Sequence, residues 1–69
     1  MRIEYKFVSS ITGGINETYS TREEYRERYY YIFNHKEEFK DNSMIYCYKY
    51  YYNDEGKIAK WQTLSIIKF

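Results

Sequence analysis

The sequence predicts a small α+β domain with the element order β(β)αββ, in which an antiparallel sheet of three or four strands carries one helix on one face. Three observations lead to this fold class. Residues 2–9 alternate between apolar and polar side chains, residues 20–42 begin with helix-start signals, and residues 44–69 contain two strand-like runs around a turn sequence. A chain of 69 residues has room for one hydrophobic core, so we expect a single domain over residues 1–69.

The first strand is predicted at residues 2–9, because its apolar side chains recur at every second position, as they do on a half-buried strand. These apolar residues are Ile3, Tyr5 and Phe7. Gly13 and Gly14 suit a two-residue hairpin turn with positive φ at both centres, and Ile15 to Tyr19 would then form the return strand. The alternative for this return segment is an ordered loop, since its polar residues bury little surface.

One helix of about five turns is predicted to end near Asn42. Ser20 to Glu24 contains two overlapping capping boxes, in which a hydroxyl and a carboxylate satisfy N–H groups at the start of a helix. The apolar positions that follow are compatible with a single stripe: Tyr25, Tyr29, Ile32, Phe33 and Phe39. An interruption at Asn34 is the alternative, because the sequence that begins there is itself a possible cap.

The last third of the chain is predicted to be a hairpin of residues 44–52 and 58–69. The segment between them suits a type I turn closed by Gly56 in a left-handed bulge. Pairing Asn53 with Lys57 sets an uninterrupted register, whose pairs include Tyr52 with Ile58, Tyr50 with Lys60, Lys49 with Trp61, and Cys47 with Thr63.

This register also assigns the two faces of the hairpin. The helix is expected to lie over the face that carries Met44, Tyr46, Leu64 and Ile66, together with the apolar side of strand 2–9. The opposite face has fewer large apolar groups and is expected to stay open. It carries Lys49, Tyr51 and Trp61.

The residues with reactive or metal-binding side chains do not form a known constellation. Cys47 and His35 are the only members of their types, so no pair has zinc-ligand spacing, and the predicted place of Cys47 within a strand suits a small buried hydrophobe. Neighbouring carboxylates fall on helix caps, on a solvated helix face or in a turn. We therefore expect no enzymatic activity, no metal and no cofactor. The single cysteine, with no signal-peptide pattern and no membrane span, favours the cytoplasm.

Tyrosine is the informative residue type, because eleven tyrosines exceed what one small core can hold. About half are accounted for by alternate inward and outward placement with cross-strand pairing. The surplus predicts a contact surface, since a tyrosine ring buries a large rigid area and offers a hydrogen bond. The candidate anchors are Tyr30, Tyr31, Tyr48, Tyr50, Tyr51, Tyr52 and Trp61, with Arg26, Arg28 and Lys49 on a polar rim.

The formal net charge of +1 favours desolvated protein contact over attraction to phosphate. We expect a stoichiometric modulator, most plausibly an inhibitor, of a larger intracellular protein. In length and composition the chain resembles accessory proteins of phages and mobile elements, including anti-restriction and anti-CRISPR inhibitors, which would act in the host cytoplasm. Two alternatives remain. One is single-stranded nucleic-acid binding through the aromatic and basic sheet face, and the other is a homodimer or larger homo-oligomer built through sheet edges.

Overall fold

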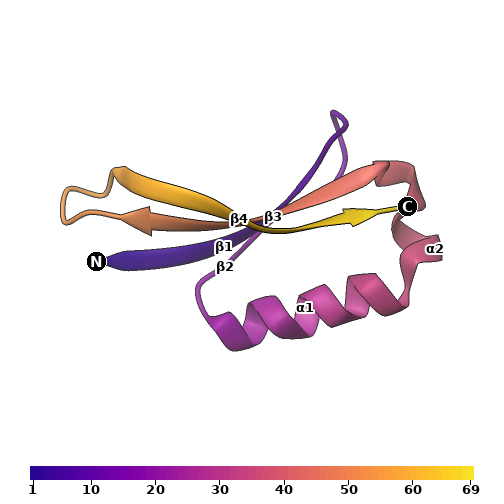
Figure 1. Ribbon diagram of the computed structural model, residues 1–69, viewed down its shortest axis with the longest axis horizontal. Coiled ribbons are helices and arrows are strands. Elements are labelled where there is room, and N and C mark those ends of the chain that lie inside the picture. The colour runs from indigo at the N-terminus through magenta and orange to yellow at the C-terminus, as the bar shows by residue number, and fades with distance from the viewer.

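Four strands form one antiparallel sheet in the order β2-β1-β3-β4, and the helices lie on one of its faces (Figure 1). The computed structural model describes residues 1–69. The strands are β1 (Arg2–Ser9), β2 (Asn16–Tyr19), β3 (Met44–Tyr52) and β4 (Ile58–Lys68). The helical elements are α1 (Arg22–Asn34), α2 (Lys36–Phe39) and the short 3-10 helix η1 (Lys40–Asn42). The predicted α+β fold class is confirmed, in its four-stranded form.

Within the predicted return segment, Asn16–Tyr19 forms a strand rather than a loop, but the turn before it differs from the prediction. The Gly14 N–H donates to the Ile11 carbonyl oxygen at 3.3 Å, so the turn is centred on Thr12 and Gly13. Only the second of these needs glycine for its backbone, because Gly13 has φ +85°. Gly14 is instead needed for space, since a Cβ there would overlap the Ser9 side chain. The predicted Gly13-Gly14 turn was therefore wrong by one residue.

The helix start is confirmed, and the helical segment ends at Asn42 as predicted, but it is interrupted near Asn34, as in the alternative prediction. Thr21 is the N-cap residue, and its hydroxyl oxygen accepts a hydrogen bond from the Glu24 N–H at 3.2 Å. Helix α1 ends at Asn34 because His35 leaves the helical region, at φ −129° and ψ 44°. The prediction of one uninterrupted helix was wrong, and the break redirects the chain so that Phe39 enters the core. None of the helices has the length and apolar character that crossing a membrane requires.

The β3–β4 hairpin has the predicted turn but a different register. The Asn53 N–H donates to the Lys57 carbonyl oxygen at 2.8 Å, and Gly56 has φ +78°. Two register shifts follow, which leave Ala59 and Leu64 without partners on β3. Beyond the confirmed Tyr52–Ile58 pair, the observed pairs therefore include Tyr51 with Lys60, Tyr50 with Trp61, Lys49 with Gln62, Tyr48 with Thr63, and Cys47 with Ser65.

The helices cover the face of the sheet that was expected to stay open. Phe7 pairs with Cys47 in the ladder between β1 and β3, so the apolar side of β1 shares its face with Ile45 and Cys47. The core consists of Tyr5, Phe7, Tyr25, Ile32, Phe39, Ile45, Cys47 and Ile67. The prediction that Met44, Tyr46 and Ile66 lie beneath the helix was wrong, because the hairpin's own pattern does not reveal which side of β1 it joins. Leu64, which is unpaired at a bulge, does lie on the helix side, beside Tyr25 and Tyr29.

Candidate binding surface

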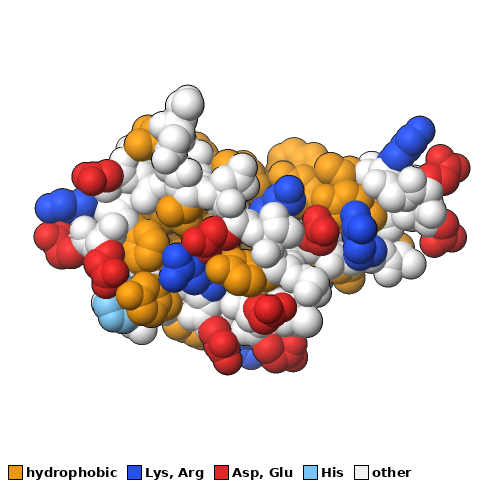
Figure 2. All heavy atoms as spheres, turned by 180° about the vertical axis from the view of Figure 1, so that it is seen from behind, with side chains coloured by type: hydrophobic (Ala, Val, Ile, Leu, Met, Phe, Trp, Pro, Cys, Tyr) orange, Lys and Arg blue, Asp and Glu red, His pale blue; other side chains and the backbone are white.

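The sheet face opposite α1 carries a continuous series of aromatic side chains, which we call the aromatic row. Its members are Tyr46, Tyr48, Tyr50 and Tyr52 from β3, and Trp61 from β4. The four tyrosines share one face because strand side chains alternate between faces, and the core uses the odd-numbered positions Ile45 and Cys47. In Figure 2 the turn end of the β3–β4 hairpin lies on the right, and hydrophobic side chains gather along the upper edge of that half of the molecule. No element of the chain covers this face (Figure 1).

The rings of the aromatic row pack against one another along and across the strands. Tyr46 and Tyr48 are stacked, with ring centroids 5.9 Å apart and ring planes 9° apart. Trp61 stands perpendicular to Tyr48, with centroids 5.5 Å apart. Such pairs stabilise a particular ring arrangement by about 0.5–1.5 kcal/mol beyond simple burial. The row is therefore an ordered surface whose side chains support one another before any partner arrives.

Exposure along the row is uneven. Trp61 is 58% exposed, whereas the four tyrosines are half-buried by their neighbours. Ile58 and Ile66 pair with Tyr52 and Tyr46 and extend the apolar surface at both ends of the hairpin. They are also exposed, Ile58 at 51%. The result is an apolar band along β3 and β4 with Trp61 as its most accessible large group.

Basic side chains from β1 lie directly over this band. The Arg2 guanidinium carbon is 4.3 Å from the centroid of the Tyr52 ring, and the Lys6 ammonium nitrogen is 5.5 Å from that of Tyr50. Between them, Glu4 interacts with the Tyr52 hydroxyl, and this hydrogen bond is the main reason that the pKa of Tyr52 is raised. The charged fringe of the row is mixed in sign.

The structure brings together four of the candidate anchors: Tyr48, Tyr50, Tyr52 and Trp61. Sequence reasoning missed Tyr46, which was assigned to the helix-covered face, and Arg2, which was assigned to no surface. Strand alternation was the signal that could have grouped the tyrosines, once the side occupied by Cys47 was known. The four grouped anchors remain a predicted contact surface.

The other two hairpin candidates, Lys49 and Tyr51, lie on the opposite face. Tyr51 pairs with Ile3 and Lys49 with Tyr5, which places both on the helix side of the sheet. The prediction that they share an open face with Trp61 was wrong, because Trp61 pairs with Tyr50 after the register shift at Ala59. Lys49 forms part of a second surface, described below.

The helix candidates point in different directions. Tyr30 is 53% exposed and lies beside Arg26 on one flank of α1. Tyr31 lies on the other flank, where its hydroxyl donates to the carboxylate of Glu38 at 3.2 Å. Neither tyrosine is part of the aromatic row, so a single contact surface does not include all the candidates.

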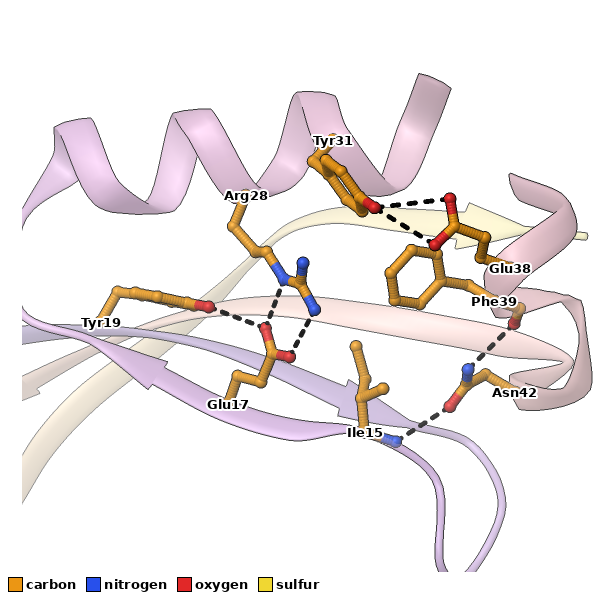
Figure 3. A network of polar contacts seen from close by, with 8 residues as sticks. All are labelled: Ile15, Glu17, Tyr19, Arg28, Tyr31, Glu38, Phe39 and Asn42. Carbon is orange, nitrogen blue, oxygen red and sulfur yellow. Dashed lines mark hydrogen bonds and ion pairs between the residues drawn. The ribbon is translucent and has the colours of Figure 1, made fainter. Parts of the chain in front are cut away.

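Arg28 is engaged within the fold and joins α1 to β2 (Figure 3). Its guanidinium donates to both carboxylate oxygens of Glu17, at 2.9 and 2.8 Å. The Tyr19 hydroxyl donates to the same carboxylate at 2.9 Å. These bonds lower the pKa of Glu17, with the guanidinium as the largest cause, and the same pair raises the pKa of Arg28. A bidentate pair of this geometry indicates a structural role for Arg28.

Asn42, a buried residue at the end of η1, joins the helical segment to the loop before β2 (Figure 3). The Asn42 side-chain N–H donates to the Phe39 carbonyl oxygen at 2.9 Å. Its side-chain oxygen accepts from the Ile15 N–H, also at 2.9 Å. No signal in the sequence distinguished this residue, because one of its partners, Ile15, lies 27 residues away in the chain.

Cys47 and His35 do not form a reactive pair. Cys47 is fully buried in the core, and burial raises the pKa of its thiol to about 11. His35 is exposed at the helix break, where its ring stacks on Tyr31 with centroids 4.1 Å apart. No group of three or more histidine, cysteine or carboxylate side chains is arranged to hold a metal ion.

No protein-family model, curated protein or solved structure matches the chain.

Proposed function

We propose that this chain is a small binding module that attaches to a larger intracellular protein through the aromatic row. The observation that supports this proposal is the uncovered, self-packed series of aromatic rings on the open face of the sheet. Aromatic residues dominate the energetics of protein interfaces, because rigid rings bury much area at little entropic cost. The activity that follows is stoichiometric inhibition or modulation, by occlusion of the partner's surface.

The arrangement of the rings favours a protein partner over single-stranded nucleic acid. Base stacking needs free ring faces. In the aromatic row, Tyr46 and Tyr48 stack on each other, and Arg2 and Lys6 lie over the rings of Tyr52 and Tyr50. What remains for a partner is mainly ring edges, hydroxyl groups and Trp61. These groups suit the mixture of apolar contact and hydrogen bonding in a protein interface.

The length and composition of the chain suggest a specific form of this activity. In this form, the chain is encoded by a phage or a mobile element and acts in the host cytoplasm. There it inhibits a defence protein of the host by covering part of its surface. The partner surface is expected to be largely apolar at its centre, where it receives Trp61, with polar groups that face the charged fringe of the row.

The proposed function is tested with Trp61→Ala and Tyr50→Ala, compared with the control Tyr30→Ala on the helix. Immobilised wild-type protein should retain a stoichiometric protein partner from nuclease-treated lysate of the native host. Each row variant should weaken binding of the purified partner at least tenfold, because central aromatic anchors contribute about 2 kcal/mol or more. Tyr30→Ala should bind within twofold of the wild type.

Two further measurements can contradict the protein-binding proposal. Thermal unfolding should show that Trp61→Ala lowers the melting temperature by only a few degrees, since the residue is exposed. A single-stranded oligonucleotide should not quench Trp61 fluorescence at about 150 mM salt. Strong quenching at this salt concentration would favour nucleic-acid binding over protein binding. Unchanged partner binding by both row variants would show that the partner contacts a different surface.

A further inference from the structure

A second candidate site lies on the other side of the sheet, between the first half of α1 and the strands β3 and β4. It is a groove of about 610 Å³ with a mixed lining. Its aromatic walls include Tyr25, Tyr29 and Tyr30, and its basic side chains are Arg22, Arg26 and Lys49. This volume lies in the range that small-molecule sites occupy, about 300–1,000 Å³. We call this feature the basic groove.

The charge of the basic groove is not balanced by the protein. No carboxylate lines the groove, and none of its three basic residues belongs to an ion pair. On the other flank of α1, by contrast, Arg28 is paired and lies with Glu24 and Glu27. The helix thus places acidic groups on one flank and leaves unpaired basic groups on the other.

The three basic side chains reach the groove from two separate elements. Arg22 and Arg26 are four residues apart on α1 and therefore lie one above the other on the helix surface. Lys49 projects from β3, with its ammonium nitrogen 5.8 Å from the centroid of the buried Tyr5 ring. Tyr51 raises the pKa of Lys49 through a hydrogen bond, while the nearby charge of Arg22 acts in the opposite direction. Three like charges thus surround one space.

The aromatic walls give the groove an apolar part beside the charges. Tyr29 and Tyr30 meet edge to face, with ring centroids 5.6 Å apart, and the Tyr29 hydroxyl lies 3.3 Å from the Ser65 hydroxyl at the strand. Tyr29 is thereby held in place, whereas Tyr30 is exposed and free to adjust. A planar group that entered the groove would meet both ring surface and basic groups.

We propose that the basic groove binds a small organic phosphate with a planar aromatic body, of the nucleoside monophosphate class. Arg22, Arg26 and Lys49 hold the phosphate, and Tyr29 and Tyr30 contact the planar body. Phosphate is favoured over a single carboxylate because it carries up to two negative charges and matches the fork geometry of arginine. The site lies across the sheet from the aromatic row, so its occupancy does not depend on the proposed protein partner.

In the experiment, the purified chain is titrated with adenosine monophosphate at about 150 mM salt. Binding is measured by calorimetry and by changes in amide chemical shifts. Adenosine and inorganic phosphate serve as separate probes for the two halves of the ligand. We expect the monophosphate to bind saturably and at least tenfold more tightly than either half. The largest shifts should fall on residues 22–30 and around Lys49.

Variants connect the binding to the basic residues. Arg26→Gln and Lys49→Gln should each weaken binding at least fivefold. Both side chains are exposed or half-buried, and neither forms an ion pair within the protein. Lys36→Gln is the matched control, since Lys36 is unpaired and lies on α2, outside the groove. It should leave affinity within twofold.

Three results would overturn the proposal. The first is equal affinity for adenosine and its monophosphate, and the second is an equal loss of affinity in the Lys36→Gln control. The third is binding of the monophosphate no tighter than that of inorganic phosphate. Retained amide spectra of the variants would show that they fold, so that a loss of binding is not a loss of structure. Partner binding through the aromatic row, measured separately, tests the other proposal independently.

Discussion

Single residues in this protein take roles that depend on burial more than on residue type. Tyr25 is buried between the rings of Tyr5 and Phe7, with centroid distances of 5.1 Å to each, and burial raises its pKa well above the ordinary range. Tyr50 carries the same side chain but stays at the open face under Lys6. Cys47, next to Tyr25 in the core, is a small apolar group rather than a nucleophile.

The buried thiol predicts a loss of stability at alkaline pH. The pKa of Cys47 is about 11 in the folded chain, whereas a cysteine in an unfolded chain has a pKa of about 8.5. The fold therefore keeps the proton over a range in which the unfolded chain has lost it. The free energy of unfolding should fall as pH rises from about 8.5 to about 11, by about 3 kcal/mol from this residue.

Urea unfolding between pH 8 and pH 11 measures this effect, with Cys47→Ala as the reference. The variant should show a shallower decline over that range, because the contribution of the thiol is removed while tyrosines and lysines still titrate. At pH 8 the folded wild type should also resist alkylation by iodoacetamide and react once unfolded. A parallel decline in wild type and variant, or rapid alkylation of the folded chain, would show that the thiol is not held neutral by the core.

At the scale of elements, the two faces of the central strand β3 determine the layers of the molecule. Ile45 and Cys47 are small enough to lie beneath Tyr25 and Ile32, and both are fully buried. The tyrosines of the other face have hydroxyl groups, which remain hydrated most easily when that face stays open. The bulge at Leu64 then restores Ile67 to the core side of β4, opposite Ile45.

A matched pair of isoleucines tests this assignment of faces. Ile45 is 0% exposed and Ile66 is 43% exposed, although they lie on neighbouring strands. Ile45→Ala should lower the free energy of unfolding by about 3 kcal/mol, because it removes buried methyl groups and leaves a cavity. Ile66→Ala should cost less than about 1 kcal/mol. Denaturant unfolding of both variants measures the difference, and a larger loss for Ile66→Ala would reverse the assigned faces.

For the molecule as a whole, the sheet is longer than the helix that covers it. Figure 1 shows the start of β1 and the turn end of the β3–β4 hairpin extending beyond the N-terminal end of α1. The long axis measures 39 Å, and residues 53–64 are exposed throughout. The β4 strand also forms one edge of the sheet, where the bulges at Ala59 and Leu64 interrupt regular pairing.

This shape predicts uneven local stability. Amides of residues 45–48 lie over the buried core, whereas those of residues 57–61 lie in the uncovered part of the hairpin. Native-state hydrogen exchange should therefore show the first group opening only with global unfolding, and the second group exchanging at least tenfold faster. Partner binding to the aromatic row should slow the second group. Uniform protection along both strands in the free chain would contradict this division.

Local patterns account for much of the fold. The alternation of residues 2–9, the N-cap at Thr21 and the turn at Gly56 each predicted an element that the structure contains. These signals are readable because neighbours along the chain produce them. The preference for one uninterrupted helix was wrong for the opposite reason: His35 leaves the helical region, and Phe39 packs into a core made largely by distant strands.

The candidate site was predictable as a residue type but not as an arrangement. The excess of tyrosine alone indicated that phenol rings would reach the surface, and the strand period placed Tyr48, Tyr50 and Tyr52 on one side. Which side that was, and which ring on β4 joins them, depended on the pairing of Phe7 with Cys47 and on the unpaired Ala59.

By itself, then, the sequence determined the α+β class, most element positions and a surplus of aromatic surface, because these depend on composition and on spacing within a segment. Only the tertiary structure decided the face that the helix covers, the register of β4 and the separation of the aromatic row from the basic groove. Each of those depends on contacts between segments distant in the chain, and a shift of one residue in pairing moves a side chain from one face of the sheet to the other.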